Sequence, residues 1–167
     1  MASSDYPTPQ SVTSDTSRGF GKEESIQSKL GRLSCAFANI VNTHDFDLAL
    51  PASQELNAHV SPEWLSSMDT QPAKLSWPQQ LEQWRARAAE MPNVRFIVQE
   101  VSSDVDERKG HAIVCLNMEV VGMAESVTLH AMNEVRWRRV GVGQNARWLC
   151  FYNLGLRGTP GNSGGLG

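Results

Sequence analysis

The chain has no excess of basic residues, which removes the simplest basis for binding nucleic acid. Its 15 Lys and Arg residues are outnumbered by 18 Asp and Glu residues, and the formal net charge is −3. A protein that grips a phosphate backbone needs a basic face. The one dense group of arginines (Arg136, Arg138 and Arg139) alternates with apolar residues, as on a solvated strand face. We therefore expect no nucleic acid among the partners.

Long apolar runs and an even number of cysteines are also missing. No stretch of about eighteen apolar residues occurs, so we expect no transmembrane helix and no membrane partner. Residues 1–16 have neither the basic start nor the apolar stretch of a secretory signal. Cys35, Cys115 and Cys150 each lie in an apolar segment, which predicts buried free thiols in a reducing compartment. The sequence thus predicts a cytoplasmic, soluble protein.

Both ends of the chain differ in composition from its middle. Residues 1–22 are rich in Ser, Thr, Pro, Asp and Gly and show no periodicity, which predicts a disordered N-terminal segment. Residues 157–167 predict a flexible, Gly-rich tail, and the flexibility should already begin at Gly155. Residues 23–156 are enough for one domain with one core.

The first half of this domain predicts helices. Apolar residues recur every three or four positions from residue 25 to residue 42, which indicates an amphipathic helix. A short second helix is expected at residues 46–56, interrupted by Pro51. Residues 59–68 should form an edge strand or extended hairpin, because Pro62 within it cannot donate to a sheet.

A third helix is expected over residues 77–90. Ser76 is a good N-cap, since Pro78 follows in the first turn and Gln79 lies three residues after the cap. Four strand-like runs come next, at residues 93–105, 111–121, 127–140 and 147–154. The turns between them are short, so neighbouring strands should be antiparallel. This order predicts an α+β fold, a cone in which a curved antiparallel sheet wraps around three N-terminal helices and encloses an apolar interior.

Alternation along the strands predicts what lines the cone. In residues 111–121 the expected inward set is uniformly apolar and consists of Ala112, Val114, Leu116, Met118 and Val120. In residues 127–140 the inward set has one polar member, Asn133. Its amide must find a partner or point at a ligand, because an unsatisfied buried amide costs about 1–3 kcal/mol. The last strand is apolar on both faces, with Tyr152 inward, and this predicts a homodimer through the outer sheet face.

The sequence has no motif for metal, covalent or phosphoryl-transfer chemistry, so we expect no metal and no cofactor. Acid–base chemistry in an apolar cavity remains, because burial moves carboxyl and imidazole pKa values toward neutrality. His59 is the leading candidate base, since the segment that it begins should close the mouth of the cone. His130 would turn inward with one β-bulge. Glu100 is a further acid or base if its strand faces it inward, which the pattern leaves open.

The order of these elements resembles the nuclear-transport-factor-2-like (NTF2-like) fold and, within it, the SnoaL-like polyketide cyclases, dehydratases and isomerases. The resemblance covers about residues 25–154 and rests on the Gly122 turn, the strand Asn133-Glu-Val-Arg-Trp137 and Trp148 in the last strand. The N-terminal composition is similar to that of small fungal members in polyketide and meroterpenoid pathways. Members with steroid isomerase or SnoaL-type cyclase activity have Asp at the position of Asn133. An amide there can donate to an enolate oxygen but cannot act as a general base.

Three functions remain open at this point. The first is a cofactor-independent cyclase or isomerase acting on a small hydrophobic or aromatic metabolite. Its predicted catalytic residues are His59, Asn133, His130 and Glu100, and its predicted substrate contacts are Trp64, Met118, Trp137 and Tyr152. The second is a non-catalytic binding or dimerisation module with a filled core. The third is a dehydratase similar to scytalone dehydratase, which favours several tyrosines, whereas this chain has two.

Overall fold

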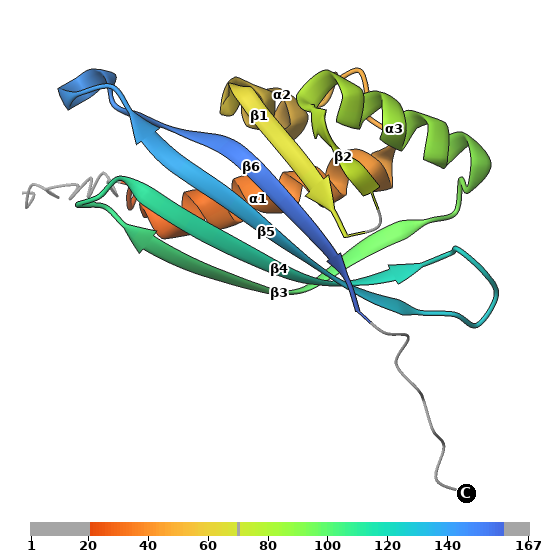
Figure 1. Cartoon of the computed structure of the whole chain (residues 1–167). Coiled ribbons are helices and arrows are strands. Elements are labelled where there is room, and N and C mark those ends of the chain that lie inside the picture. Colours follow the sequence, from red (N-terminus) through yellow and green to blue (C-terminus); the bar gives the residue numbers. More distant parts are fainter. Residues whose placement is uncertain (1–20, 70, 159–167) are drawn as a thin grey trace, which may run out of the picture.

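The computed structural model describes residues 21–69 and 71–158, in which helices cover one face of a single curved sheet (Figure 1). The sheet has the strand order β2-β1-β6-β5-β4-β3, and β1 and β6 are its one parallel pair. The elements in chain order are α1 (Ile26–Thr43), α2 (Pro51–Ala58), β1 (Val60–Met68), β2 (Gln71–Ser76), α3 (Trp77–Glu90), β3 (Arg95–Asp106), β4 (His111–Val121), β5 (Leu129–Val140), the short 3-10 helix η1 (Gly143–Asn145) and β6 (Arg147–Arg157). Residues 1–20 and 159–167, which hold most of the expected disordered segment and tail, lie outside the described residues.

Side-chain caps determine where two of the helices begin. The Ser25 hydroxyl accepts the N–H of Ser28 at the start of α1, at 3.1 Å. Ser76 and Gln79 form the predicted capping box of α3, in which each side chain accepts the other residue's backbone N–H. Pro51 does not interrupt a helix, as expected above, but begins α2, where a missing N–H costs nothing.

Strand β2 has no counterpart among the predicted elements, and β1 is not the edge strand that the sequence predicts. The two strands form a hairpin, so β1 lies between β2 and β6 rather than at an edge. Pro62 is tolerated because it falls between Val60 and Leu65, where the pairing of β1 with β6 shifts register. Pairing with β2 begins only at Leu65. A proline at this irregularity removes no regular ladder bond.

The core lies between α1 and the strands β4, β5 and β6. The predicted inward set of β4 is confirmed, since all five of its side chains are buried. Trp137 is also fully buried, and its indole N–H donates to the equally buried Ser34 hydroxyl on α1 at 3.1 Å. Trp64 packs against Phe37, with the ring centroids 6.2 Å apart. Trp64, Trp137 and Met118 are therefore core residues.

Two bulges change the faces that simple alternation predicts. The register of β5 against β6 shifts between Arg136 and Trp137, which leaves Phe151 as an extra residue in β6. Every later side chain of β6 is inverted as a result. Tyr152 thus lies on the outer face, where the Arg136 guanidinium is 5.1 Å from its ring centroid. The prediction that Tyr152 faces the interior is wrong.

The second bulge lies in β3, where pairing with β4 shifts between Val98 and Glu100. Glu100 consequently lies on the exposed face and accepts a hydrogen bond from the Asn117 side chain at 3.3 Å. It is not the desolvated carboxyl that an inward position would have made. At the other end of the sheet β6 continues to Arg157, so residues 155–157 are paired with β5 rather than flexible.

Candidate functional site

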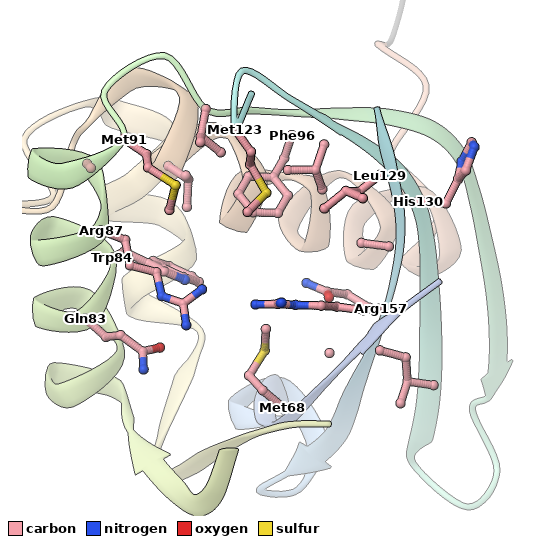
Figure 2. Close-up of a pocket in the computed structure, with 18 of the residues that line it drawn as sticks. Met68, Gln83, Trp84, Arg87, Met91, Phe96, Met123, Leu129, His130 and Arg157 are labelled. Atoms are coloured by element: carbon pink, nitrogen blue, oxygen red, sulfur yellow. The ribbon is translucent and has the colours of Figure 1, made fainter. Parts of the chain in front are cut away.

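An apolar cavity of about 100 Å³ lies between α3 and the concave face of the sheet, near the end of α1 (Figure 2). Its apolar wall is formed mainly by large side chains from α3, β1, β3, β5 and the β4–β5 turn: Met68, Trp84, Met91, Phe96, Met123 and Leu129. The cavity reaches the surface, because His44, His130 and Arg157 at its rim are exposed. A space of this kind can hold a small molecule with an apolar body.

One face of α3 forms a whole wall of the cavity. Gln83, Trp84, Arg87, Ala88 and Met91 all line it. Their spacing of three and four residues places them on one side of a helix. Arg87 lies in the last helical turn and is half-buried. The polar side chains Gln83 and Arg87 thus share this face with the apolar Trp84 and Ala88.

A glycine turn supports the mouth of the cavity. Gly122 has φ +83°, a backbone conformation that favours glycine. A Cβ at this position would overlap the carbonyl oxygen of Asn93. The close approach brings the segment after α3 against the β4–β5 turn, so that Val94 and Met123 both line the cavity.

Asn133 lies in the cavity wall on β5, as its inward parity predicts. It pairs with Gly155 on β6, and the absence of a side chain at Gly155 leaves room for Met68 and for the Asn133 amide. Within residues 21–69 and 71–158 no hydrogen bond engages the Asn133 side chain. Its donor and acceptor groups are therefore available to a ligand.

A short chain of buried polar groups leads inward from the cavity. The Ser66 hydroxyl donates to Gln80 Oε1 at 2.6 Å, and Gln80 Nε2 donates to Gln83 Oε1 at 3.2 Å. Ser66 and Gln80 are only 1% and 2% exposed, so this chain fixes the orientation of the Gln83 amide at the cavity. Nothing in the local sequence pattern signals it, because its members come from β1 and α3.

The ionisable groups at the cavity are all basic. Arg87 and Arg157 line it, as do His44 and His130. His44 ends α1 in a left-handed conformation, with its ring 5.8 Å from that of Phe46. Among the described lining residues there is no Asp, Glu, Tyr, Lys or Cys. The wall thus offers hydrogen-bond donors and histidines, but no carboxylate.

Of the residues predicted from sequence, Asn133 lies in the wall of this cavity and His130 lies only at its rim. No bulge turns His130 inward, since β5 pairs regularly with β4 around it, and its ring points away from the cavity (Figure 2). His59 instead ends α2, where its Nδ1 lies 2.9 Å from the carbonyl oxygen of Trp148, and it does not line the cavity. Met118 does not line this cavity but borders a second, more open hollow, which His130 also lines. Trp64 and Trp137 pack in the core, while Glu100 and Tyr152 face outward.

The buried thiol and the acidic side chains give no alternative centre. Burial raises the pKa of Cys150 to about 12, which keeps its thiol protonated at neutral pH. The described part of the chain contains no group of three or more His, Cys, Asp or Glu side chains placed to hold a metal ion. No helix in this part combines the length and apolar character needed to cross a membrane.

No protein-family model matches the sequence, and no curated protein matches it. Solved structures do resemble the fold. An NTF2-like protein of unknown function from Pseudomonas putida is 13% identical, with a TM-score of 0.60 over 81% of this chain and 89% of the other. A candidate dehydratase of the NTF2-like family from Streptomyces avermitilis is 15% identical, with a TM-score of 0.56 over 78% and 94%.

A third similar structure is a candidate calcium/calmodulin-dependent protein kinase type II association domain from Thiobacillus denitrificans. It is 12% identical, with a TM-score of 0.53 over 76% of this chain and 93% of the other. At such identities the similarity establishes the fold alone. The chain therefore has the NTF2-like cone fold, which the order of its elements predicted.

Proposed function

We propose that the protein is a cofactor-independent cyclase or isomerase of the SnoaL-like type. Its substrate would be a small hydrophobic or aromatic metabolite, derived from a polyketide or meroterpenoid in fungal-type secondary metabolism. The observation that carries the proposal is an apolar cavity with an unengaged side-chain amide, Asn133, in its wall. Such a wall binds the apolar body of a substrate and directs a hydrogen bond to one of its oxygens.

The reaction begins with removal of a proton from the carbon next to a substrate carbonyl. Asn133 donates to the oxygen, which becomes negatively charged as the enolate forms. His44, which lines the cavity, takes the proton as the general base. The enolate then closes a ring onto an electrophilic carbon of the same molecule or regains the proton at a different carbon. His59 has no part in this version, because it lies away from the cavity.

The proton-removal step can be tested without knowledge of the substrate. We expect the protein to accelerate hydrogen–deuterium exchange at the carbon next to the carbonyl of 2-tetralone in D2O, followed by proton NMR. Asn133→Ala should slow the catalysed exchange at least about tenfold, because it removes the oxyanion donor. His44→Gln should also slow the exchange, because it removes the base, whereas His130→Gln should leave the rate nearly unchanged. His111→Gln, an exposed position on β4 away from the cavity, is the control.

Exchange at the same rate with and without protein, or equal rates for wild type and Asn133→Ala, would contradict the enzyme proposal. A dehydratase, as in one similar structure, is the weaker alternative because no tyrosine lines the described part of the cavity. It would show as loss of water from a β-hydroxyketone probe without exchange of 2-tetralone.

A second proposed role, association with another copy of the chain, is supported by a separate observation. Leu149 and Phe151 lie on the outer sheet face, and the bulge in β6 adds Tyr152 and Leu154, which makes this face more apolar than simple alternation predicts. Leu65, Ile97 and Ile113 on the same face are 38–43% exposed. We propose a homodimer through this face. Light scattering should give twice the monomer mass, and Ile113→Lys should shift the protein to monomers, whereas a monomeric wild type would contradict the proposal.

A further inference from the structure

We infer that the cavity is built for an anionic ligand: a small aromatic or alkenyl carboxylate, whose carboxylate is held by Arg87 and Arg157. The inference rests on the proposed small-molecule site and names the chemical class that it accepts. The apolar body of the ligand would lie on the side of Trp84, Phe96 and Leu129.

The charge of the cavity is opposite to that of the chain. The protein has a formal net charge of −3, yet the charged side chains at the described cavity wall are the two guanidinium groups of Arg87 and Arg157. Figure 2 shows Arg87 reaching from α3 and Arg157 from the end of β6 into the space between helix and sheet. Two cations that converge from opposite walls of an apolar space create a strong preference for an anion.

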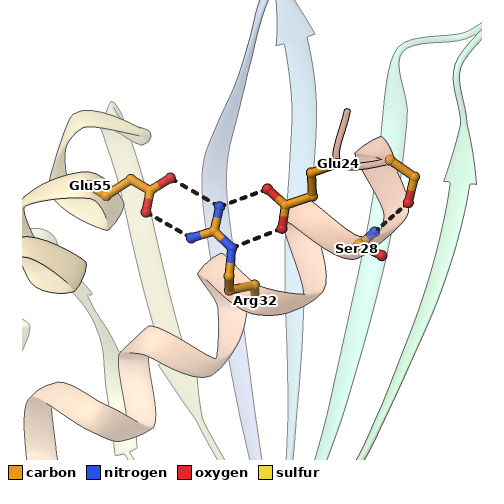
Figure 3. A network of polar contacts seen from close by, with 5 residues as sticks. Glu24, Ser28, Arg32 and Glu55 are labelled. Atoms are coloured by element: carbon orange, nitrogen blue, oxygen red, sulfur yellow. Dashed lines mark hydrogen bonds and ion pairs between the residues drawn. The ribbon is translucent and has the colours of Figure 1, made fainter. Parts of the chain in front are cut away.

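Other arginines in the described residues show what a structural arginine looks like in this protein. Arg32 lies between Glu24 and Glu55 and makes two hydrogen bonds to each carboxylate, at 2.7–3.1 Å (Figure 3). Arg85, Arg136 and Arg138 are paired with Asp47, Glu134 and Glu63 at 2.6–2.7 Å. Within the same part of the chain Arg87 and Arg157 have no such ion pair. Four further arginines also have no ion pair there: Arg95 and Arg147 donate to backbone carbonyls, and Arg108 and Arg139 are exposed and away from the cavity. Arg87 and Arg157 differ from these because they occur together at the cavity.

The backbone around Arg157 is fixed while its guanidinium is left available. The Asp69 carboxylate accepts the backbone N–H of Arg157 at 2.9 Å, and the Asp69 N–H donates to the Gly155 carbonyl at 3.1 Å. These bonds tie the end of β6 to the β1–β2 turn. Asp69 thus engages the main chain of Arg157 and leaves its guanidinium group unpaired within the described residues.

A carboxylate fits the donors present better than a neutral group does. Guanidinium groups bind carboxylates with two parallel N–H donors each. Gln83 also lines the cavity, and because its Oε1 accepts from Gln80, its Nε2 is the group that has no hydrogen bond within the described residues. A neutral apolar ligand would cover these cations without pairing them, which is unfavourable. The ligand class therefore follows from two guanidinium groups that have no anionic partner inside the described cavity.

Matched pairs of acid and amide test the charge requirement directly. We would measure the binding of benzoate and benzamide, cinnamate and cinnamamide, and 2-naphthoate and 2-naphthamide by isothermal titration calorimetry at low salt. The best-fitting acid should bind at least about tenfold more tightly than its amide, since hydrogen bonds to charged groups are the stronger ones. Arg87→Gln and Arg157→Gln should each weaken binding of the acid about tenfold and change binding of the amide less than about twofold.

Arg108→Gln is the matched control, because it removes the same charge from an exposed position in the β3–β4 turn, away from the cavity. Melting temperatures of all variants show whether each one is folded. If the Arg157→Gln variant is not folded, the Arg87→Gln variant, whose substitution lies on the surface of α3, still tests the inference. Equal affinities for acid and amide, or a preference that survives both arginine substitutions, would overturn the anionic ligand but leave the small-molecule site in place. Binding of no member of any pair at millimolar concentration would overturn the site and this inference together.

Discussion

Replacing Ala131 by leucine tests whether the space between α3 and the sheet is hollow. Ala131 is a half-buried residue of β5 that lines the cavity. The substitution Ala131→Leu adds three carbon atoms to the wall. In a hollow cone these atoms fill the cavity, whereas in a filled core they collide with neighbours, so the two cases give changes in stability of opposite sign.

The magnitude follows from the cavity volume. Burial of one methylene group contributes about 0.8 kcal/mol, so three carbon atoms contribute at most about 2.4 kcal/mol. An empty apolar cavity costs about 24 cal/mol per Å³, which for about 100 Å³ also gives about 2.4 kcal/mol. Because this cavity reaches the solvent, we expect about half of that limit, an increase of about 1 kcal/mol in the free energy of unfolding.

Urea unfolding followed by tryptophan fluorescence measures this change, since one of the five tryptophans, Trp84, lies at the cavity. Ala86→Leu, at an exposed position of α3, adds the same atoms outside the cavity and should change stability by less than about 0.5 kcal/mol. Ala131→Leu should also abolish the binding of aromatic acids. A loss of about 1–3 kcal/mol, as overpacking produces, would refute the hollow cone.

Three further substitutions probe the fold around the site. Gly122→Ala should lower the free energy of unfolding by about 2–3 kcal/mol or more in urea titrations, because the added methyl group meets the Asn93 backbone and φ is positive; a loss under 1 kcal/mol would contradict this. Trp137→Phe should lower the free energy of unfolding by about 2–3 kcal/mol, because it leaves the buried Ser34 hydroxyl without its donor and opens a void. It should not alter the affinity for aromatic acids, and a weakened affinity would show that Trp137 contributes to the binding site. Burial raises the pKa of Cys150 from 9.0 to about 12, so the stability that its protonated thiol contributes is complete below about pH 9 and is lost as the pH rises toward 12. Cys150→Ala should make unfolding stability measured between those pH values less pH-dependent, and an unchanged slope would count against the burial argument.

Patterns within one element predicted most of the fold. The spacing of apolar residues identified α1, the Ser76 capping box identified the start of α3, and the uniform inward set of β4 was confirmed. These features depend on interactions between residues a few positions apart, which the sequence displays directly. The presence of Asn133 at the cavity follows from the same alternation along β5. The hairpin strand β2 was missed because its short, Pro-containing run has no clear period.

The composition of the site was less predictable, because it depends on where strands slip and where distant segments meet. One extra residue at Phe151 turned Tyr152 outward, and one at Gln99 did the same to Glu100. Because side chains alternate between the two faces of a strand, one extra residue moves every later side chain to the opposite face. No local sequence pattern predicts either bulge. Arg87 and Arg157 lie far apart in the sequence and belong to a helix and a strand, so their convergence on one cavity depends on how α3 packs against the sheet. Local periodicity thus determined the cone, while the packing of its elements determined that the cone is lined with cations instead of a carboxylate.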